Sequence, residues 1–171
     1  AATPTNMTTG STSEGMVFDG TDDYVVLTPF LFGGTFTIEF MIKAAASSEN
    51  DWDKILTAYQ ASPTKYHYIQ FNGSTGKIKL AGISSGGAET TSTTSSSSFL
   101  HVVMTMDNTS SIFYVNGVQE DTGSGYTYDK LVYTNLFLGQ DYPGNDNPLT
   151  GTIAFFRIWQ DTALSASDVA R

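Results

Sequence analysis

Residues 136–161 read LFLGQDYPGNDNPLTGTIAFFRIWQD, two strand-like runs with a polar loop between them. The runs, Leu136 to Gly139 and Thr150 to Gln160, are rich in the apolar, β-branched and aromatic residues that favour strands. The loop contains Asp, Asn, Gly and Pro, which favour surface turns, and its side-chain oxygens are also ligands that calcium prefers. The stretch therefore predicts two core strands and places a candidate site between them.

Outward from this stretch, short apolar runs separated by turn residues continue through the chain, a pattern typical of all-β sandwiches and barrels. In residues 36–43, FTIEFMIK, every second residue is Phe or Ile, which gives a single strand one apolar face. The other predicted strands are residues 16–18, 24–27, 54–59, 66–71, 77–80, 99–106 and 112–115.

The remaining local signals are turns, one ambiguous stretch and one helical segment. The Ser- and Thr-rich residues 84–98 allow a flexible loop or an edge strand, and the β-branched threonines favour a strand at Glu89 to Thr94. Asn116-Gly117 predicts a tight hairpin turn, because both residues tolerate positive φ. Only Leu164 to Arg171 looks helical, with Ser165 and Asp168 at capping-box spacing. The sequence thus predicts an all-β fold, a two-sheet antiparallel jelly-roll sandwich with a short C-terminal helical turn.

The length of the chain bounds the number of domains. With 171 residues it is long enough for one domain with a substantial core. Residues 1–15 are rich in Thr, Ser and Gly and have little to bury, so we interpret them as an N-terminal linker or arm, with pairing along a sheet edge as the alternative. Residues 16–171 form the predicted domain.

Charge and composition argue against several functions. Eight Lys and Arg stand against 17 Asp and Glu, a formal net charge of -9, which disfavours nucleic acid as a partner. No apolar run reaches the roughly 20 residues of a membrane span, so no membrane insertion is expected. The chain has no cysteine, and two histidines, His67 and His101, give poor support to a zinc site.

Six motifs along the chain resemble the laminin-G-like and concanavalin A-like lectin and glucanase jelly rolls. In chain order they are MVFDGTDDYVVL, FTIEFMIKA, FLHVVMTMD, IFYVNGVQ, LFLGQ and LTGTIAFFRIWQDTALSASDV, and the similarity covers residues 16–171. The last two are most similar to the pentraxins, in which a calcium-binding loop follows LGQ. The resemblance implies a β-sandwich with a binding role and a calcium ligand at Asp141. Pro143 departs from the pentraxin pattern, which has a second acidic ligand there.

Two acidic stretches are candidate metal sites. In the polar loop, Asp141, Asn145 and Asp146 offer side-chain oxygens for calcium, which takes six to eight oxygen ligands in flexible geometry. The second choice is the acidic turn formed by Asp19, Asp22 and Asp23. For both stretches a turn that binds nothing is the alternative, because Asp, Asn and Gly are common in turns.

Aromatic residues in polar surroundings are candidate ligand contacts. Sugars are held by aromatic rings that stack on C–H patches and by a few planar polar side chains. The predicted ligand-binding residues are Trp52, Asp53, Tyr59, Tyr66, Asp141 and Tyr142. Trp159 is instead interpreted as a core anchor.

No catalytic residue is predicted. A retaining glucanase of this architecture needs two carboxylates about 5 to 5.5 Å apart, supplied by an E-x-D-x-E strand that the sequence lacks. We therefore expect a non-catalytic recognition module of a larger cell-surface, secreted or virion protein that binds a glycan or a surface protein, with calcium as a candidate cofactor. A structural module that assembles into oligomers is the alternative, and a glucanase-like enzyme is the third interpretation.

Overall fold

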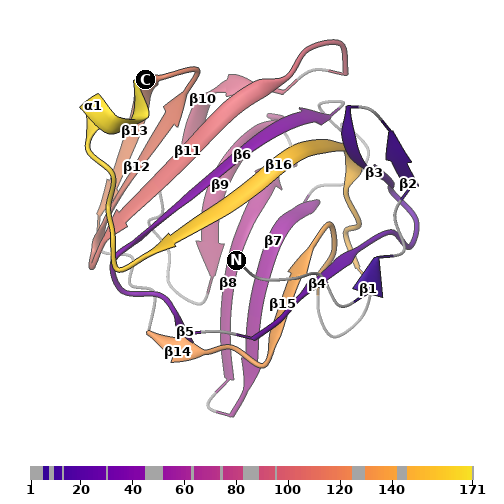
Figure 1. The fold of residues 1–171 in the computed structure, drawn as a ribbon, viewed down its shortest axis with the longest axis horizontal. Coiled ribbons are helices and arrows are strands. Elements are labelled where there is room, and N and C mark those ends of the chain that lie inside the picture. Colours follow the sequence, from indigo (N-terminus) through magenta and orange to yellow (C-terminus); the bar gives the residue numbers. More distant parts are fainter. Residues whose placement is uncertain are drawn as a thin grey trace.

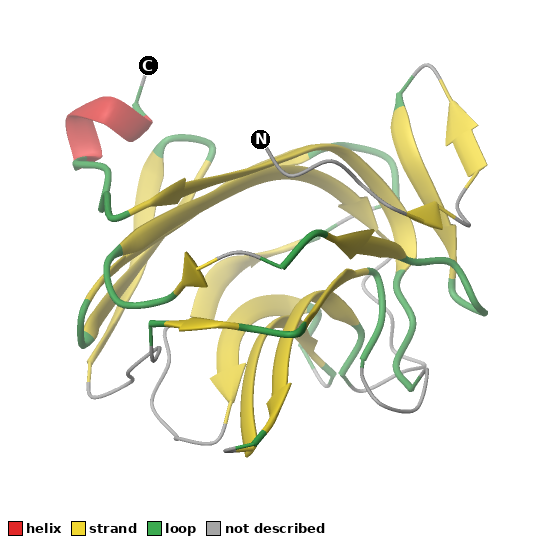
Figure 2. Ribbon diagram, turned by 60° about the horizontal axis from the view of Figure 1, so that its bottom comes forward, coloured by secondary structure: helices red, strands yellow, loops and turns green. Residues whose placement is uncertain are grey.

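The computed structural model describes the chain except for residues 1–5, 8–9, 13, 30, 45–51, 63, 74, 83–88, 95, 125–129, 142–145 and 171. The described residues form two seven-stranded antiparallel sheets, a two-stranded ribbon and one helical turn (Figure 1). The two large sheets are the layers of a sandwich, and the helical turn lies on the outer side of one of them (Figure 2). The prediction of an all-β, two-sheet antiparallel jelly-roll sandwich is confirmed.

The first sheet includes the Thr-rich strand that the sequence left ambiguous. Its order is β1 (Asn6–Met7), β4 (Val25–Leu27), β15 (Asn135–Leu138), β7 (Lys54–Ala61), β8 (Thr64–Asn72), β9 (Lys77–Gly82) and β10 (Glu89–Thr93). The edge strand β10 pairs with β9, which confirms the favoured reading of that stretch. The other edge strand, β1, comes from the segment interpreted as a linker or arm and pairs with β4.

The second sheet contains the longest strand of the described chain, β16 (Thr150–Gln160). Its order is β13 (Val118–Ser124), β12 (Ser110–Val115), β11 (Leu100–Asp107), β6 (Phe36–Ala44), β16, β3 (Gly15–Asp19) and β2 (Gly10–Thr12). Strand β2 also lies within residues 1–15 and pairs with β3, while the domain boundary at residue 16 stays a prediction. The two-residue strands β5 (Leu31–Phe32) and β14 (Leu131–Val132) pair with each other and are too short for the sequence to predict.

The two strands of residues 136–161 lie in different sheets. Strand β15 pairs with β4 and β7 in the first sheet, and β16 pairs with β3 and β6 in the second. The polar loop between them therefore connects the two layers of the sandwich. Its ends are fixed by backbone hydrogen bonds, because Asp141 N donates to Asp146 O at 3.1 Å and Leu149 N donates to Gly139 O at 2.8 Å.

The core lies between the sheets and follows the alternation of each strand. Phe36, Ile38, Phe40 and Ile42 of β6 are fully buried in it, as the sequence predicts. They belong to the same buried cluster as apolar residues of the first sheet such as Ile69 on β8. Burial of this apolar surface is the main driving force for folding. The intervening residues of each strand project from the outer faces of the sandwich, where binding sites can form.

The predicted turn and cap are both confirmed. Asn116 and Gly117 have φ angles of 51° and 79°, the positive values that a two-residue turn between β12 and β13 requires. Helix α1 (Ala166–Val169) begins after the N-cap Ser165, and Ser165 and Asp168 form the expected capping box. Within the described residues, no helix has both the length and the apolar character that a membrane crossing requires.

Candidate functional site

The outer face of the first sheet carries a row of tyrosines. Alternation along β8 turns Ile69 into the core and Tyr66 and Tyr68 outward, and the register places Tyr59 of β7 directly opposite Tyr66. The ring centroids of Tyr59 and Tyr66 are 4.8 Å apart, and those of Tyr66 and Tyr68 are 6.0 Å apart. We call this surface, defined by Tyr59, Tyr66 and Tyr68, the tyrosine face.

Trp52 extends this aromatic surface from the turn that precedes β7. Its side chain remains 42% exposed. Lys79 Nζ, from β9, lies 4.3 Å from the centroid of the Trp52 ring, a cation–π contact that helps to orient the indole. Lys54 Nζ donates a hydrogen bond of 2.7 Å to the Trp52 carbonyl. Lys54 therefore holds the backbone of Trp52, and Lys79 contacts its ring.

Lys54 is a buried cation at the base of the site. The residue is only 4% exposed, and its Nζ lies 3.7 Å from Asp141 Oδ2 and 4.9 Å from the ring centroid of Tyr68. Burial lowers the pKa of Lys54, while the negative charges of Asp141 and Asp53 oppose that shift. The lysine thus joins the tryptophan turn, the tyrosine face and the polar loop in one cluster.

Asp141 is the acceptor at the centre of this cluster. Burial, together with the charge of Asp141 and a hydrogen bond to it, raises the pKa of Tyr68, so the Tyr68 hydroxyl remains a donor to the carboxylate. The turn at Gly139 and the hydrogen bond from Asp141 N to Asp146 O set the position of this carboxylate. One acceptor, one cation and one phenol therefore meet beside exposed aromatic rings.

The structure brings four of the six predicted ligand-binding residues onto one surface. Trp52, Tyr59 and Tyr66 supply rings, and Asp141 supplies the carboxylate. Asp53 is 1% exposed, so it acts on the site through its charge on Lys54 and is not a surface contact. Tyr142 lies outside the described residues.

Sequence reasoning missed three residues of the cluster: Lys54, Tyr68 and Lys79. Tyr68 had a signal, because the period of two in YHYIQF places Tyr66 and Tyr68 on one face while His67 is buried against Tyr133. Lys54 had no such signal, since a lysine at the start of a strand is usually solvated. Its burial depends on the long-range approach of Asp141.

The two candidate metal sites have different surroundings. At the polar loop, Asn145 is outside the described residues, Asp146 is exposed, and the Asp141 carboxylate already faces the Lys54 ammonium. A calcium ion at Asp141 would therefore have to compete with the Lys54 ammonium for the carboxylate. The carboxylates of Asp19, Asp22 and Asp23 lie within 4.8 Å of one another and could bind a metal ion. Asp19 Oδ1 and Asp23 Oδ2 each accept a backbone N–H inside that turn.

The outer face of the second sheet carries a buried glutamate, Glu39 of β6. Glu39 Oε1 is 2.7 Å from His101 Nε2, and Glu39 Oε2 is 2.8 Å from an Arg157 nitrogen. It is therefore the centre of an ion-paired cluster and lies away from the tyrosine face. Trp159 lies on the same outer surface and is only partly buried, so its interpretation as a core anchor is wrong.

Comparison with known proteins places this geometry in a structural group. A family model described as the Concanavalin A-like lectin/glucanases superfamily matches residues 19–170. A search of curated proteins finds no match.

Solved structures share the fold at low sequence identity. Domain 4 of AbnA, an extracellular arabinanase from Geobacillus stearothermophilus, solved with arabinotriose, aligns with a TM-score of 0.74 and 18% identity over 99% of this chain and 85% of that one. A Trypanosoma rangeli sialidase aligns with a TM-score of 0.72 and 15% sequence identity, over 99% of this chain and 28% of the sialidase chain. The present chain therefore spans about a quarter of the length of that enzyme. A heptameric pentraxin from Limulus polyphemus aligns with a TM-score of 0.63 and 16% sequence identity, over 90% of this chain and 78% of the pentraxin chain.

Proposed function

The chain belongs to the concanavalin A-like lectin/glucanases superfamily, and from this premise we propose that it is a non-catalytic module that binds a glycan on its tyrosine face. The observation that carries the proposal is the row of Tyr59, Tyr66 and Tyr68 with Trp52 beside it. The arabinotriose complex of the AbnA domain supports a carbohydrate as the ligand class, and its extracellular source supports a surface or secreted location.

The chemistry of the face suits a sugar better than a protein partner. Aromatic rings offer apolar planes for the C–H patches of a pyranose or furanose, and the Asp141 carboxylate and the Lys79 ammonium can bond its hydroxyls. The core of a protein interface is depleted of Lys and Asp, whereas this surface places lysines and an aspartate among its rings. The same mixture of apolar planes and a few convergent polar groups is typical of small-ligand sites.

Removal of one ring from the face tests the proposal. We expect Tyr66→Ala to weaken binding of arabinotriose, or of the best ligand from a glycan array, at least tenfold, a loss of about 1.4 kcal/mol. The reason is that Tyr66 lies between Tyr59 and Tyr68 and its loss divides the ring surface. Isothermal titration calorimetry measures the affinity.

A matched aromatic substitution beside the other sheet is the control. Phe99 is partly exposed beside Lys43 of β6, so Phe99→Ala removes a ring of similar size while the tyrosine face stays intact. Equal affinities of wild type and Tyr66→Ala would contradict the proposal. If no glycan on the array binds and light scattering finds a stable oligomer, the assembly interpretation replaces it.

Calcium dependence is a separate prediction for the same face. We expect a chelator to leave glycan binding unchanged, because Lys54 already supplies positive charge beside Asp141. Calcium that binds only the native state at ten times its Kd stabilises by about 1.4 kcal/mol, roughly 3 to 5 °C in Tm. Any such calcium-induced rise should disappear in Asp22→Asn and persist in Asp141→Asn. The opposite pattern, or glycan binding lost in chelator, would place a functional calcium ion at the polar loop.

A further inference from the structure

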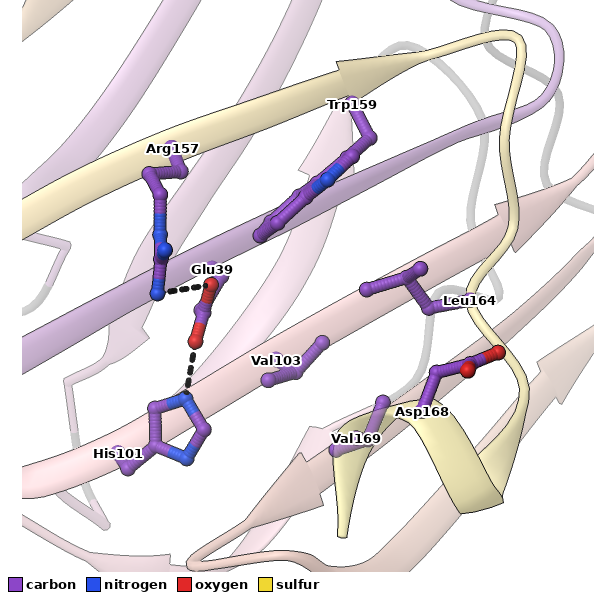
Figure 3. A pocket seen from close by; sticks show the side chains of 8 residues that line it. All are labelled: Glu39, His101, Val103, Arg157, Trp159, Leu164, Asp168 and Val169. Atoms are coloured by element: carbon purple, nitrogen blue, oxygen red, sulfur yellow. Dashed lines mark hydrogen bonds and ion pairs between the residues drawn. The ribbon is translucent and has the colours of Figure 1, made fainter. Parts of the chain in front are cut away.

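A hollow lies on the opposite side of the sandwich from the tyrosine face, between the second sheet and the C-terminal segment. It has a volume of about 200 Å³ and is lined by Glu39, His101, Val103, Arg157, Trp159, Leu164, Asp168 and Val169. Figure 3 shows Trp159, Glu39 and His101 along one side, Val103 in the middle, and Leu164, Asp168 and Val169 on the other side. We call this the helix-side hollow. It shares no residue with the tyrosine face.

The walls of the hollow are fixed by the fold. Val103, Glu39 and Arg157 are directly paired across β11, β6 and β16, so they form a row on the outer face of the second sheet. The opposite wall is tied to the same sheet, because Thr37 Oγ1 donates to Thr162 O and accepts from Leu164 N, both at 2.9 Å. The space between the walls is therefore a built feature of the native state.

The polar groups of the hollow are organised around one buried carboxylate. Glu39 is 9% exposed and bridges His101 and Arg157, using one oxygen for each. Each carboxylate oxygen has a second lone pair, so Glu39 can still accept from a ligand. The Arg157 side chain is 58% exposed, and its guanidinium has five N–H donors, which leaves donors that face solvent.

The apolar groups lie next to these polar ones. The guanidinium carbon of Arg157 is 5.4 Å from the centroid of the Trp159 ring and 4.8 Å from that of the Phe155 ring. These two contacts hold the guanidinium in place. Trp159 itself remains partly exposed at the rim, and Val103, Leu164 and Val169 supply an aliphatic surface. A flat ring, an aliphatic wall, a donor fork and a carboxylate acceptor are the groups that bind one sugar ring.

From this geometry we propose that the helix-side hollow binds a single neutral sugar ring, as a second site independent of the tyrosine face. A volume of about 200 Å³ is on the scale of one sugar ring. Its charged groups are one arginine, two carboxylates and one histidine, so they give no excess of positive charge for an acidic sugar. Two sites on opposite faces would let one module bridge two glycan chains, or gain avidity on a dense glycan surface.

The two tryptophans allow the sites to be measured separately. Trp52 and Trp159 are the only tryptophans of the chain, and each lies at a different site. In Trp52→Phe the tryptophan emission comes from Trp159 alone. We expect saturable quenching or a blue shift when this variant is titrated with a panel of neutral methyl glycosides, with a Kd on the order of 1 mM for a ligand of that size.

Variants of the lining decide whether the signal comes from the hollow. In the Trp52→Phe background, Arg157→Met and Glu39→Gln should each weaken the binding of the responding glycoside at least fivefold. Arg157→Met changes an exposed side chain, so it keeps the test valid if Glu39→Gln is destabilised. Lys43→Met is the control, since it also removes a cation from the outer face of β6 and lies outside the lining.

Several results would overturn the proposal. One is an unchanged Trp159 emission with every neutral methyl glycoside up to 50 mM, a concentration about fifty times the expected Kd. Another is a response that both lining variants leave intact. Tighter binding of N-acetylneuraminic acid than of any neutral glycoside would refute the assigned class. Failure of Tyr66→Ala to affect binding at the tyrosine face bears only on the first site, so the two proposals fail separately.

Discussion

Lys54→Met is expected to lower the free energy of unfolding by about 3 kcal/mol, which corresponds to a fall in Tm of roughly 6 to 12 °C. Methionine keeps much of the aliphatic volume of the buried side chain but removes the charge. Asp53 is 1% exposed, and the Asp141 side chain is 20% exposed, so both carboxylates would lose the cation that faces them. Because Asp141 retains some contact with water, the lower end of the range for a broken buried pair applies.

Two further variants separate charge from volume. Lys79→Met is the matched control on the neighbouring part of the same face, and it removes the cation–π contact with Trp52, worth about 0.5 to 1 kcal/mol at an exposed site. Lys54→Met combined with Asp141→Asn should be more stable than Lys54→Met alone, because the double variant also lacks the uncompensated negative charge of Asp141. Thermal melts of the four proteins measure this. A Lys54→Met protein that melts within 2 °C of wild type would show that the buried cation contributes little.

The same variant links stability to binding. The Lys54 ammonium also donates to the Trp52 carbonyl, so its loss frees the turn that carries the most exposed ring of the proposed site. A glycan that stacks on Trp52 would then have to order that turn on binding, which reduces affinity. Lys54→Met should therefore weaken glycan binding even at temperatures where the protein is fully folded.

Most of the fold could be predicted from the sequence because its strands have simple patterns. The alternation in residues 36–43 gives β6 its buried face, and Asn116-Gly117 gives the turn between β12 and β13. The pairing of strands was less accessible. Leu136 to Gly139 and Thr150 to Gln160 are adjacent in sequence yet lie in different sheets, because each finds its partners among strands far away in the chain.

The candidate site was only half accessible from the sequence, for the same reason. Rings in polar surroundings, such as Trp52 and Tyr66, could be selected one by one. These rings come together with the polar groups only because of the register of β7 with β8 and because the return of the chain after β15 brings Asp141 next to Lys54. Lys54 becomes part of the site only through that return. The hollow beside Trp159 depends in turn on where the C-terminal segment lies against β6.

Gly139 is the residue that makes the return at Asp141 possible. Its φ is +88°, a region that glycine adopts readily and other residues do not. Its N–H donates to Ile55 O at 3.2 Å, and its carbonyl accepts from Leu149 N, so the residue is bonded on both sides. A Cβ at this position would lie 2.4 Å from two ring carbons of Phe18, which is buried in the core. The glycine in the LGQ motif is thus required by both backbone and packing.

Gly139→Ala is accordingly expected to lower the free energy of unfolding by about 2 to 5 kcal/mol, from roughly 1 to 2 for the positive φ and roughly 1 to 3 for overpacking against Phe18. The fall in Tm should be on the order of 10 °C. Gly34→Ala is the matched control, because its φ of +71° carries the same backbone cost while its Cβ would meet only the Lys130 side chain at 3.7 Å. Gly139→Ala must therefore melt well below Gly34→Ala. Equal melting temperatures would mean that the core adjusts around Phe18 without cost. The close approach of β15 to β3 would then not explain the position of Asp141 beside Lys54.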